Sequence, residues 1–254
     1  MNASFLYSAN AWVLCTLLFL LMMIASFAGF KARQRNLSAG ENLGPVEGSL
    51  FALLGLLLAF TFGMSGSRYD NRRAVMIQEV NNIGTALLRA DMYDDSNRVA
   101  FRKDFKEYIE ARVAYYDRNE AKVIASKEMT SKYAGLLWAR AASLSKNPAY
   151  LAASNQMIPA LNEMIDITTV REVSMRAKVP DIILLLLFAI SIACSWLAGF
   201  EIPASKWINW ITVAGFALLT VLVIYVIMDL DQPRRGLINL DANQQLMKNL
   251  LESF

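Results

Sequence analysis

The side chains that could do chemistry in this sequence are mainly carboxylates on helix-forming segments. Glu79, Glu163 and Asp166 each lie in a stretch that otherwise shows an apolar helical stripe. Grouped carboxylates can exchange protons as an acid and a base, or can bind a metal ion. None of the three belongs to an EF-hand or P-loop pattern. Ion pairs with Arg171 and other basic residues are the favoured interpretation, and we expect no enzyme, no metal site and no cofactor.

Histidine and cysteine usage narrows the chemistry further. The sequence has no histidine, which removes the commonest general base and every His-based metal site. The two cysteines, Cys15 and Cys194, lie in hydrophobic runs and are expected to be small buried side chains. The net charge of +3 is too small to indicate nucleic acid as a partner, so the basic residues are interpreted as membrane flanks.

A basic group follows the second hydrophobic run at Arg68, Arg72 and Arg73. One interpretation is that these arginines anchor the helix at the membrane interface. The other is that they form an electropositive vestibule that concentrates anions. Asp70 lies three residues before Arg73 and can pair with it, so the field at this point is not purely positive.

Four hydrophobic runs account for the high apolar content, which is 56% of the residues. The first 30 residues carry no charge, and three further charge-free runs cover residues 48–67, 182–200 and 207–228. Each run is about as long as a helix needs to cross ~30 Å of hydrocarbon. We therefore expect an all-α integral membrane protein with four transmembrane helices and a helical cytoplasmic extension, not a soluble enzyme.

The polar middle of the chain is expected to be helical as well. Met76, Val80, Ile83 and Leu87 recur at intervals of three and four residues, which places them on one helical face. No proline occurs between residues 48 and 91, so the second membrane helix should continue into the solvent. The tail has a similar apolar face and should dock on the helical region, on a neighbouring subunit or on the membrane surface.

These patterns divide the chain into four parts. We expect a first transmembrane helix pair at 1–66, a helical cytoplasmic region at 67–180, a second transmembrane pair at 181–229 and an amphipathic C-terminal tail at 230–254. Pro180 is expected to mark the junction before the third membrane helix.

Basic residues beside the runs predict which side of the membrane each part occupies. The flanks on the side of the polar middle carry eight basic residues, which are Arg68, Arg72, Arg73, Arg171, Arg176, Lys178, Arg234 and Arg235. The opposite flanks carry four basic residues, which are Lys31, Arg33, Arg35 and Lys206. The positive-inside rule then predicts that the polar middle and both termini lie in the cytoplasm. We expect a multi-pass protein of the cell inner membrane. The flanks of the first helix alone favour the opposite orientation.

Small residues share one face of the second membrane helix, because Gly55, Ala59 and Gly63 are four residues apart. Such a face lets another helix approach closely, and tight packing is one interpretation. The other is a pore-lining helix, because copies of this face around an axis would form a narrow apolar constriction. A constriction of that kind can gate by dewetting.

Several motifs taken together resemble the bacterial bestrophin-like membrane proteins. The motifs are LLGLLLAF at 53–60, RYDNRR at 68–73, EVNNIGTA at 79–86, LNEMID at 161–166 and DLDQPRRG at 229–236. The resemblance covers the chain from about residue 48 to its end.

Bestrophins are pentameric anion channels in which the second of four membrane helices lines a neck of apolar side chains. The resemblance therefore implies a homo-oligomer, with a pentamer as the first expectation, in the lipid bilayer and with chloride or another anion as the permeant ion. It implies the pore-lining candidates Ala52, Leu56 and Phe60 and the cytoplasmic vestibule candidates Arg68, Arg72 and Arg73. No acidic calcium clasp is recognisable, so calcium gating is not implied. The alternative is a non-conducting membrane scaffold or sensor whose helical region binds a partner.

Overall fold

The structure is a computed structural model that describes residues 6–7, 9–35, 44–115, 119–202, 208–232, 238, 241–252 and 254. These residues are almost wholly helical and include no strand, which confirms the all-α prediction. The chain divides into two compact units. The membrane unit comprises Met1–Arg68 with Lys178–Gln232, and the polar unit comprises Tyr69–Ala177 with Pro233–Phe254.

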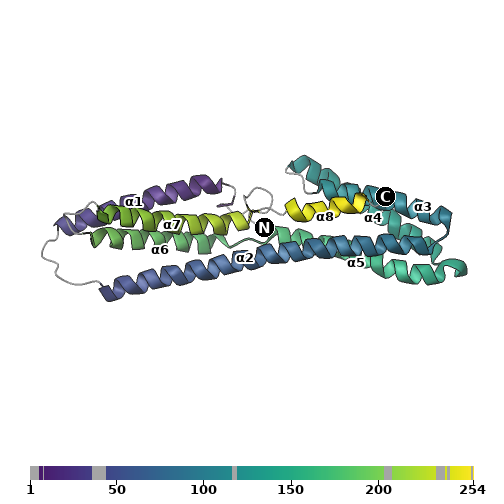
Figure 1. The fold of residues 1–254 in the computed structure, drawn as a ribbon, viewed down its shortest axis with the longest axis horizontal. Coiled ribbons are helices and arrows are strands. Elements are labelled where there is room, and N and C mark those ends of the chain that lie inside the picture. The colour runs from purple at the N-terminus through teal and green to yellow at the C-terminus, as the bar shows by residue number, and fades with distance from the viewer. Residues whose placement is uncertain are drawn as a thin grey trace. The chain divides into compact units, whose positions relative to one another are not determined.

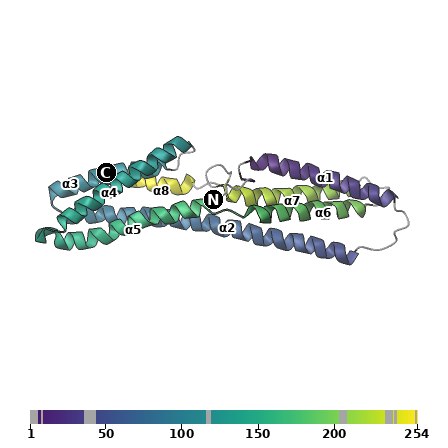
Figure 2. The ribbon, with the colours of Figure 1, turned by 180° about the vertical axis from the view of Figure 1, so that it is seen from behind.

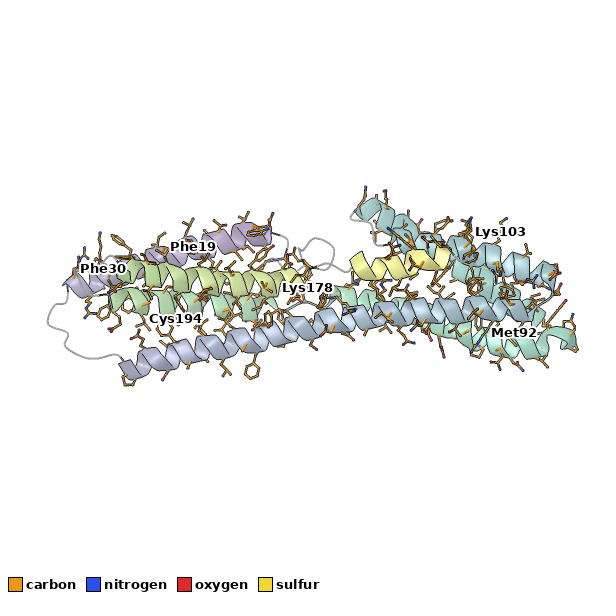
Figure 3. All side chains as sticks on the ribbon, in the orientation of Figure 1. Phe19, Phe30, Met92, Lys103, Lys178 and Cys194 are labelled. Carbon is orange, nitrogen blue, oxygen red and sulfur yellow. The ribbon has the colours of Figure 1, made fainter. Side chains whose placement is uncertain are left out.

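The membrane unit contains the four helices that are long and apolar enough to cross a membrane. They are α1 (Ala11–Arg35), the first part of α2 (Gly44–Arg89), α6 (Asp181–Phe200) and α7 (Ile208–Leu230). Helices α1, α6 and α7 lie side by side along most of their length (Figures 1 and 2). Their contact buries Leu18, Met22 and Leu187. Cys15 and Cys194 are both buried free thiols, as expected, and Cys194 lies on α6 (Figure 3).

Helices α1 and α6 touch backbone to backbone. A Cβ atom on Gly199 would lie 1.9 Å from the carbonyl oxygen of Ser26, and one on Gly29 would lie 2.1 Å from that of Trp196. Ser26 also donates a hydrogen bond from Oγ to the Ser195 carbonyl, at 2.8 Å. Small residues of this kind let membrane helices approach closely. Within the described residues, close packing through small residues therefore occurs between α1 and α6.

The polar unit is a bundle built from the second part of α2 and four further helices (Figure 1). They are α3 (Asp95–Ala114), α4 (Glu120–Leu144), α5 (Leu151–Arg176) and α8 (Asp241–Leu251). Two short 3-10 helices, η1 (Ala90–Met92) and η2 (Pro148–Tyr150), lie at the turns. The core contains Ile83, Phe101, Phe105, Leu137 and Met157, all fully buried.

Local sequence signals explain where these helices begin and end. Asn147 accepts a hydrogen bond from the Ala149 amide, and Pro148 occupies the first position of η2, so α4 cannot continue. Pro180 is the N-cap of α6, which confirms the predicted junction. Helix α2 is a single helix of 46 residues, as the lack of proline predicted.

The tail docks within its own chain. Helix α8 packs against α3, and its Met247 is fully buried in the core of the polar unit. This is the first of the three placements considered from the sequence. Lys206, Arg234 and Arg235, which the prediction of membrane sidedness counted, lie outside the described residues.

Candidate functional site

Among the four apolar helices of the described residues, α2 is the one that the rest of the described chain covers least. Only 17% of its most hydrophobic window is buried, against 28% for α1, 39% for the window that includes α6 and 44% for α7. The face that does pack carries Leu54, Thr61 and Ser65. The rest of this part of α2 is left for lipid or for another copy to cover.

The bare face of α2 carries the three pore-lining candidates. Leu56 is 53% exposed and Phe60 is 63% exposed, and Ala52 is exposed one turn before them. Residues four apart lie one above another on a helix, so the structure brings these three together in a single row. We call this row the α2 row.

An open groove overlaps the end of the α2 row at Phe60 and continues along the same helix. Its volume is about 510 Å³. It is lined by Ala59, Phe60, Gly63, Met64, Ser67 and Arg68. A Cβ atom on Gly55 or Gly63 would meet nothing within 4 Å, so no segment of the described chain packs against these glycines.

Arg68 ends the membrane part of α2 and faces a buried carboxylate. Its Nη1 lies 3.6 Å from Oδ2 of Asp231, which is fully buried at the end of α7. The same oxygen accepts hydrogen bonds from the Tyr7 hydroxyl at 2.9 Å and from the Val179 amide at 2.7 Å. A buried carboxylate needs such donors. The Asp231 carboxylate, directly after α7, therefore contacts side chains or backbone from the N-terminal segment, from α2 and from the residues just before α6.

Arg72 and Arg73 have different surroundings although they are adjacent. Arg72 is buried and donates from Nε to the Ser174 carbonyl at 3.1 Å and from Nη2 to the Ala177 carbonyl at 2.5 Å. These carbonyls belong to the C-terminal turn of α5, where a cation is favourable. Arg73 is exposed. The two arginines therefore have different environments, and their spacing in the sequence does not predict this difference.

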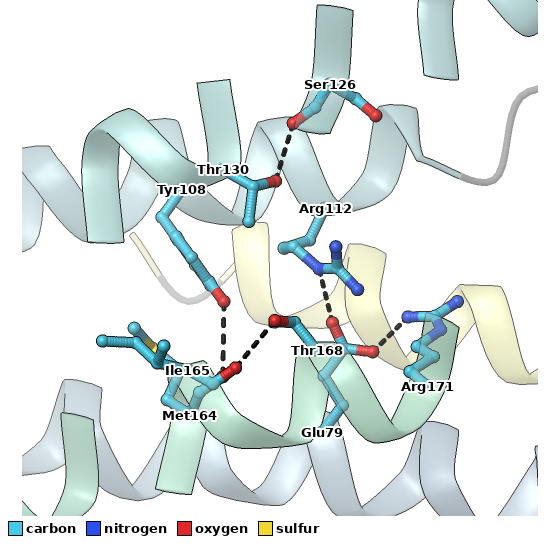
Figure 4. A network of polar contacts seen from close by, with 9 residues as sticks. All are labelled: Glu79, Tyr108, Arg112, Ser126, Thr130, Met164, Ile165, Thr168 and Arg171. Carbon is cyan, nitrogen blue, oxygen red and sulfur yellow. Dashed lines mark hydrogen bonds and ion pairs between the residues drawn. The ribbon is translucent and has the colours of Figure 1, made fainter. Parts of the chain in front are cut away.

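Glu79 forms the centre of a buried ion cluster in the polar unit (Figure 4). Its Oε1 accepts from Arg112 Nε at 2.5 Å, and its Oε2 accepts from Arg171 Nη1. All three side chains are buried. Burial raises the pKa of Glu79, but the two guanidinium groups outweigh this and hold the pKa below its usual value. The predicted ion pair with Arg171 is confirmed, and Arg112 is the additional partner.

The other two carboxylates singled out from the sequence do not join this cluster. Glu163 and Asp166 are exposed on α5, and the backbone carbonyl of Glu163 accepts a hydrogen bond from Asn82 Nδ2 at 3.0 Å. Within the described residues no three cysteine or carboxylate side chains are grouped closely enough to hold a metal ion.

Comparison with known proteins gives a consistent result. The family model of the bestrophin-like domain matches residues 13–243. Two crystal structures of variants of a bacterial bestrophin homologue from Klebsiella pneumoniae share the fold. One has a TM-score of 0.72 at 15% identity and covers 96% of this chain and 98% of the homologue. The other has a TM-score of 0.70 at 15% identity, with coverage of 93% and 97%.

No curated protein matches the sequence significantly. The family match nevertheless spans most of the chain and both units, and it agrees with the four apolar helices. This chain is a membrane protein that belongs to the bestrophin-like family.

Proposed function

We propose that the protein is a homo-oligomeric ion channel in which α2 lines the pore and anions are the favoured ions. The observation that carries this proposal is the α2 row, an apolar face that the other described residues leave bare. The bestrophin-like family, which is associated with channels and not with enzymes, supports it. Five copies around an axis is the arrangement that we propose first.

The α2 row provides a closed resting state. In an oligomer, each copy would present the same face of α2 to the axis. Leu56 and Phe60, one turn apart, would then form stacked apolar rings. Such rings resist wetting, so ions are held back without a moving lid.

Basic residues after the row provide the preference for anions. We propose that Arg68 and Arg73 lie at the cytoplasmic mouth of the pore, where their field attracts chloride or another anion. Arg72, the third vestibule candidate, acts indirectly by holding the C-terminal turn of α5. Arg68 is paired with Asp231, and Asp70 is exposed nearby, so both carboxylates offset part of the positive field.

The proposed orientation is that of a multi-pass inner-membrane protein with the polar unit and both termini in the cytoplasm. Labelling of Ser96→Cys, at an exposed position near the start of α3, tests it in intact cells. Protection from an impermeant reagent until the cells are permeabilised is the expected result. Ready labelling of intact cells would reverse the orientation.

Purified protein in liposomes tests conduction directly. We expect chloride flux that rises several-fold in Leu56→Ala and Phe60→Ala, because the shorter side chains widen the rings. Ile24→Ala is the matched control, because Ile24 is also 63% exposed but lies on α1. This variant should conduct like the parent. If neither the parent nor the two α2 variants conduct, the channel proposal fails and the scaffold or sensor takes its place.

Bilayer recordings test selectivity separately. Arg73→Gln removes an exposed charge near the proposed mouth and should shift the reversal potential in a salt gradient towards that of a less anion-selective pore. Lys103→Gln removes an exposed charge on α3 and should leave the reversal potential unchanged. Equal shifts for both variants would show that Arg73 does not lie at the pore.

A further inference from the structure

The polar unit contains a pocket that the proposed pore does not use. It lies between α3, α4 and α5 and has a volume of about 380 Å³. Pockets of roughly 300–1,000 Å³ are the size that buries small organic molecules. Its lining combines charged groups, hydroxyl groups and apolar side chains.

Two cations define the charged end of the pocket. Arg112 is buried, and its guanidinium lies 4.7 Å from the centre of the Tyr115 ring. Lys127 Nζ lies 6.0 Å from the same ring and 2.6 Å from Oε1 of Glu172. Both cations belong to the lining, together with Tyr115 and Glu172.

The charge balance of this end favours an anionic ligand. Among the described lining residues, Arg112 and Lys127 oppose the single carboxylate of Glu172. Glu172 also pairs with Arg176, so this one carboxylate is shared between two cations, Lys127 and Arg176. Arg112 is held in place by Glu79 and carries five N–H donors, so it can bind a second anionic group while keeping this partner.

The hydroxyl groups along the pocket are set to accept hydrogen bonds. Thr130 Oγ1 donates to the Ser126 carbonyl and Thr168 Oγ1 donates to the Ile165 carbonyl, each at 2.7 Å (Figure 4). Because each hydroxyl proton is directed to the backbone, the lone pairs of these oxygens are what a ligand meets. A ligand hydroxyl or N–H group would satisfy them.

The apolar part of the lining has space beside Gly135. Gly135 and Trp138 line it on α4, and Ile165 lines it on α5. A Cβ atom on Gly135 would meet nothing within 4 Å. Glycine inside a helix is destabilising relative to alanine, and here it leaves room where a side chain would otherwise project. A ring placed beside Trp138 would occupy that room.

We propose that this pocket binds a small organic acid with a flat apolar body and a hydroxyl group. The acid group would pair with Arg112 and Lys127, the body would stack beside Trp138 over Gly135, and the hydroxyl would donate to Thr130 or Thr168. The inference concerns the polar unit alone and does not depend on ion conduction.

Binding of 4-hydroxyphenylacetate to the full chain in detergent tests the proposal. Trp138 is the only tryptophan in the polar unit, so its fluorescence reports on the pocket, and Trp138→Phe identifies its signal. We expect saturable binding with a Kd in the range of about 1 mM or below. The neutral 4-hydroxyphenylacetamide should bind at least roughly tenfold more weakly, because it lacks the charge. Phenylacetate should bind a few-fold more weakly, because it lacks the hydroxyl.

Substitutions in the wall separate pocket binding from partition into the micelle. Gly135→Leu fills the pocket and should abolish binding, whereas Gly135→Ala should keep it within about threefold. Lys127→Gln should weaken binding several-fold, and Lys132→Gln, an exposed change on the same helix, should not. A thermal unfolding curve for each variant confirms that it is folded.

Three results would overturn the proposal. They are an absence of saturable binding to the parent protein, equal binding of the acid and its amide, and unchanged binding by a folded Gly135→Leu variant. The last two would assign the signal to the micelle or to another site.

Discussion

The two parts of α2 have opposite surroundings although they form one helix. In the membrane unit, Leu56 and Phe60 are left more than half exposed by the rest of the chain. In the polar unit, Glu79, Ile83 and Ala86 are fully buried. Both parts are rich in apolar side chains, so hydrophobicity alone does not separate them. The difference shows that the described chain covers the apolar side chains of the polar-unit part of α2. The apolar side chains of the membrane part remain for another copy or for lipid to cover, or to line a pore.

The largest loss in the free energy of unfolding is expected from a substitution at Glu79, in the buried part of α2. Glu79→Ala leaves Arg112 and Arg171 buried beside each other without their shared carboxylate. Removing one member of a buried ion pair costs roughly 3–5 kcal/mol. Unfolding by SDS in mixed micelles measures the loss. Asp91→Asn removes the carboxylate from an exposed pair with Arg102 and should cost no more than about 1 kcal/mol. Similar losses in the two variants would contradict the comparison.

Matched aliphatic truncations compare the two parts of α2 directly. Ile83→Ala removes a fully buried side chain and should cost roughly 2–5 kcal/mol, because it leaves a cavity. Leu56→Ala removes a side chain that is 53% exposed and should cost less than about 1 kcal/mol in the isolated subunit. The same mixed-micelle unfolding measures both. A large loss for Leu56→Ala that appears only at oligomer-forming protein concentrations would show that a second copy covers the α2 row.

Glycine substitutions sharpen the comparison within the membrane unit. Gly199→Ala places a methyl group against the Ser26 backbone and should cost roughly 1–3 kcal/mol through overpacking. Gly63→Ala, on the bare part of α2, meets open space and should stabilise the helix by about 0.5–1 kcal/mol. Thermal unfolding in detergent should therefore move in opposite directions for the two variants. Equal destabilisation would mean that Gly63 is as tightly packed as Gly199.

The smallest expected effect is a pH dependence of the free energy of unfolding, which comes from Glu79 in the buried part of α2. An unfolded glutamate has a pKa of about 4.3, and the arginines hold the pKa of folded Glu79 lower despite its burial. The stabilisation from Glu79 is therefore complete above roughly pH 4.3 and is lost as the pH falls through the folded pKa. The difference in stability between the parent and Glu79→Gln should shrink in acid by at most about 1.4 kcal/mol per pH unit. A difference that stays constant down to pH 3 would contradict this.

Most of the fold could be predicted from local signals. Apolar runs of membrane-spanning length, helical periodicity and the junction at Pro180 are properties of neighbouring residues, and the structure confirms them. The Glu79–Arg171 pair could be predicted as well, because a carboxylate on an apolar helical stripe needs a cation.

The remaining features depend on partners that are distant in the sequence. Arg72 binds carbonyls 102 and 105 residues later, so its burial could not be seen from a basic group that looks uniform. Arg112 carries no sequence sign of its bond to Glu79. The close α1–α6 contact could not be predicted because Gly29 and Gly199 are isolated glycines, whereas Gly55 and Gly63 have the regular spacing that is typical of close helix packing.

The contact between α1 and α6 can form only late in biosynthesis, because α6 is made long after α1. Ser26 and Ser195, which join the two helices, are 169 residues apart in the chain. A ribosome that adds about 5–20 residues per second needs about 8–34 s to make the second after the first. During that interval α1 and α2 must reside in the bilayer while the whole polar segment is translated. The nascent membrane unit therefore passes through a stage with only two helices. Until α6 is made, the face of α1 that carries Ser26 and Gly29 can contact insertases, chaperones or other proteins.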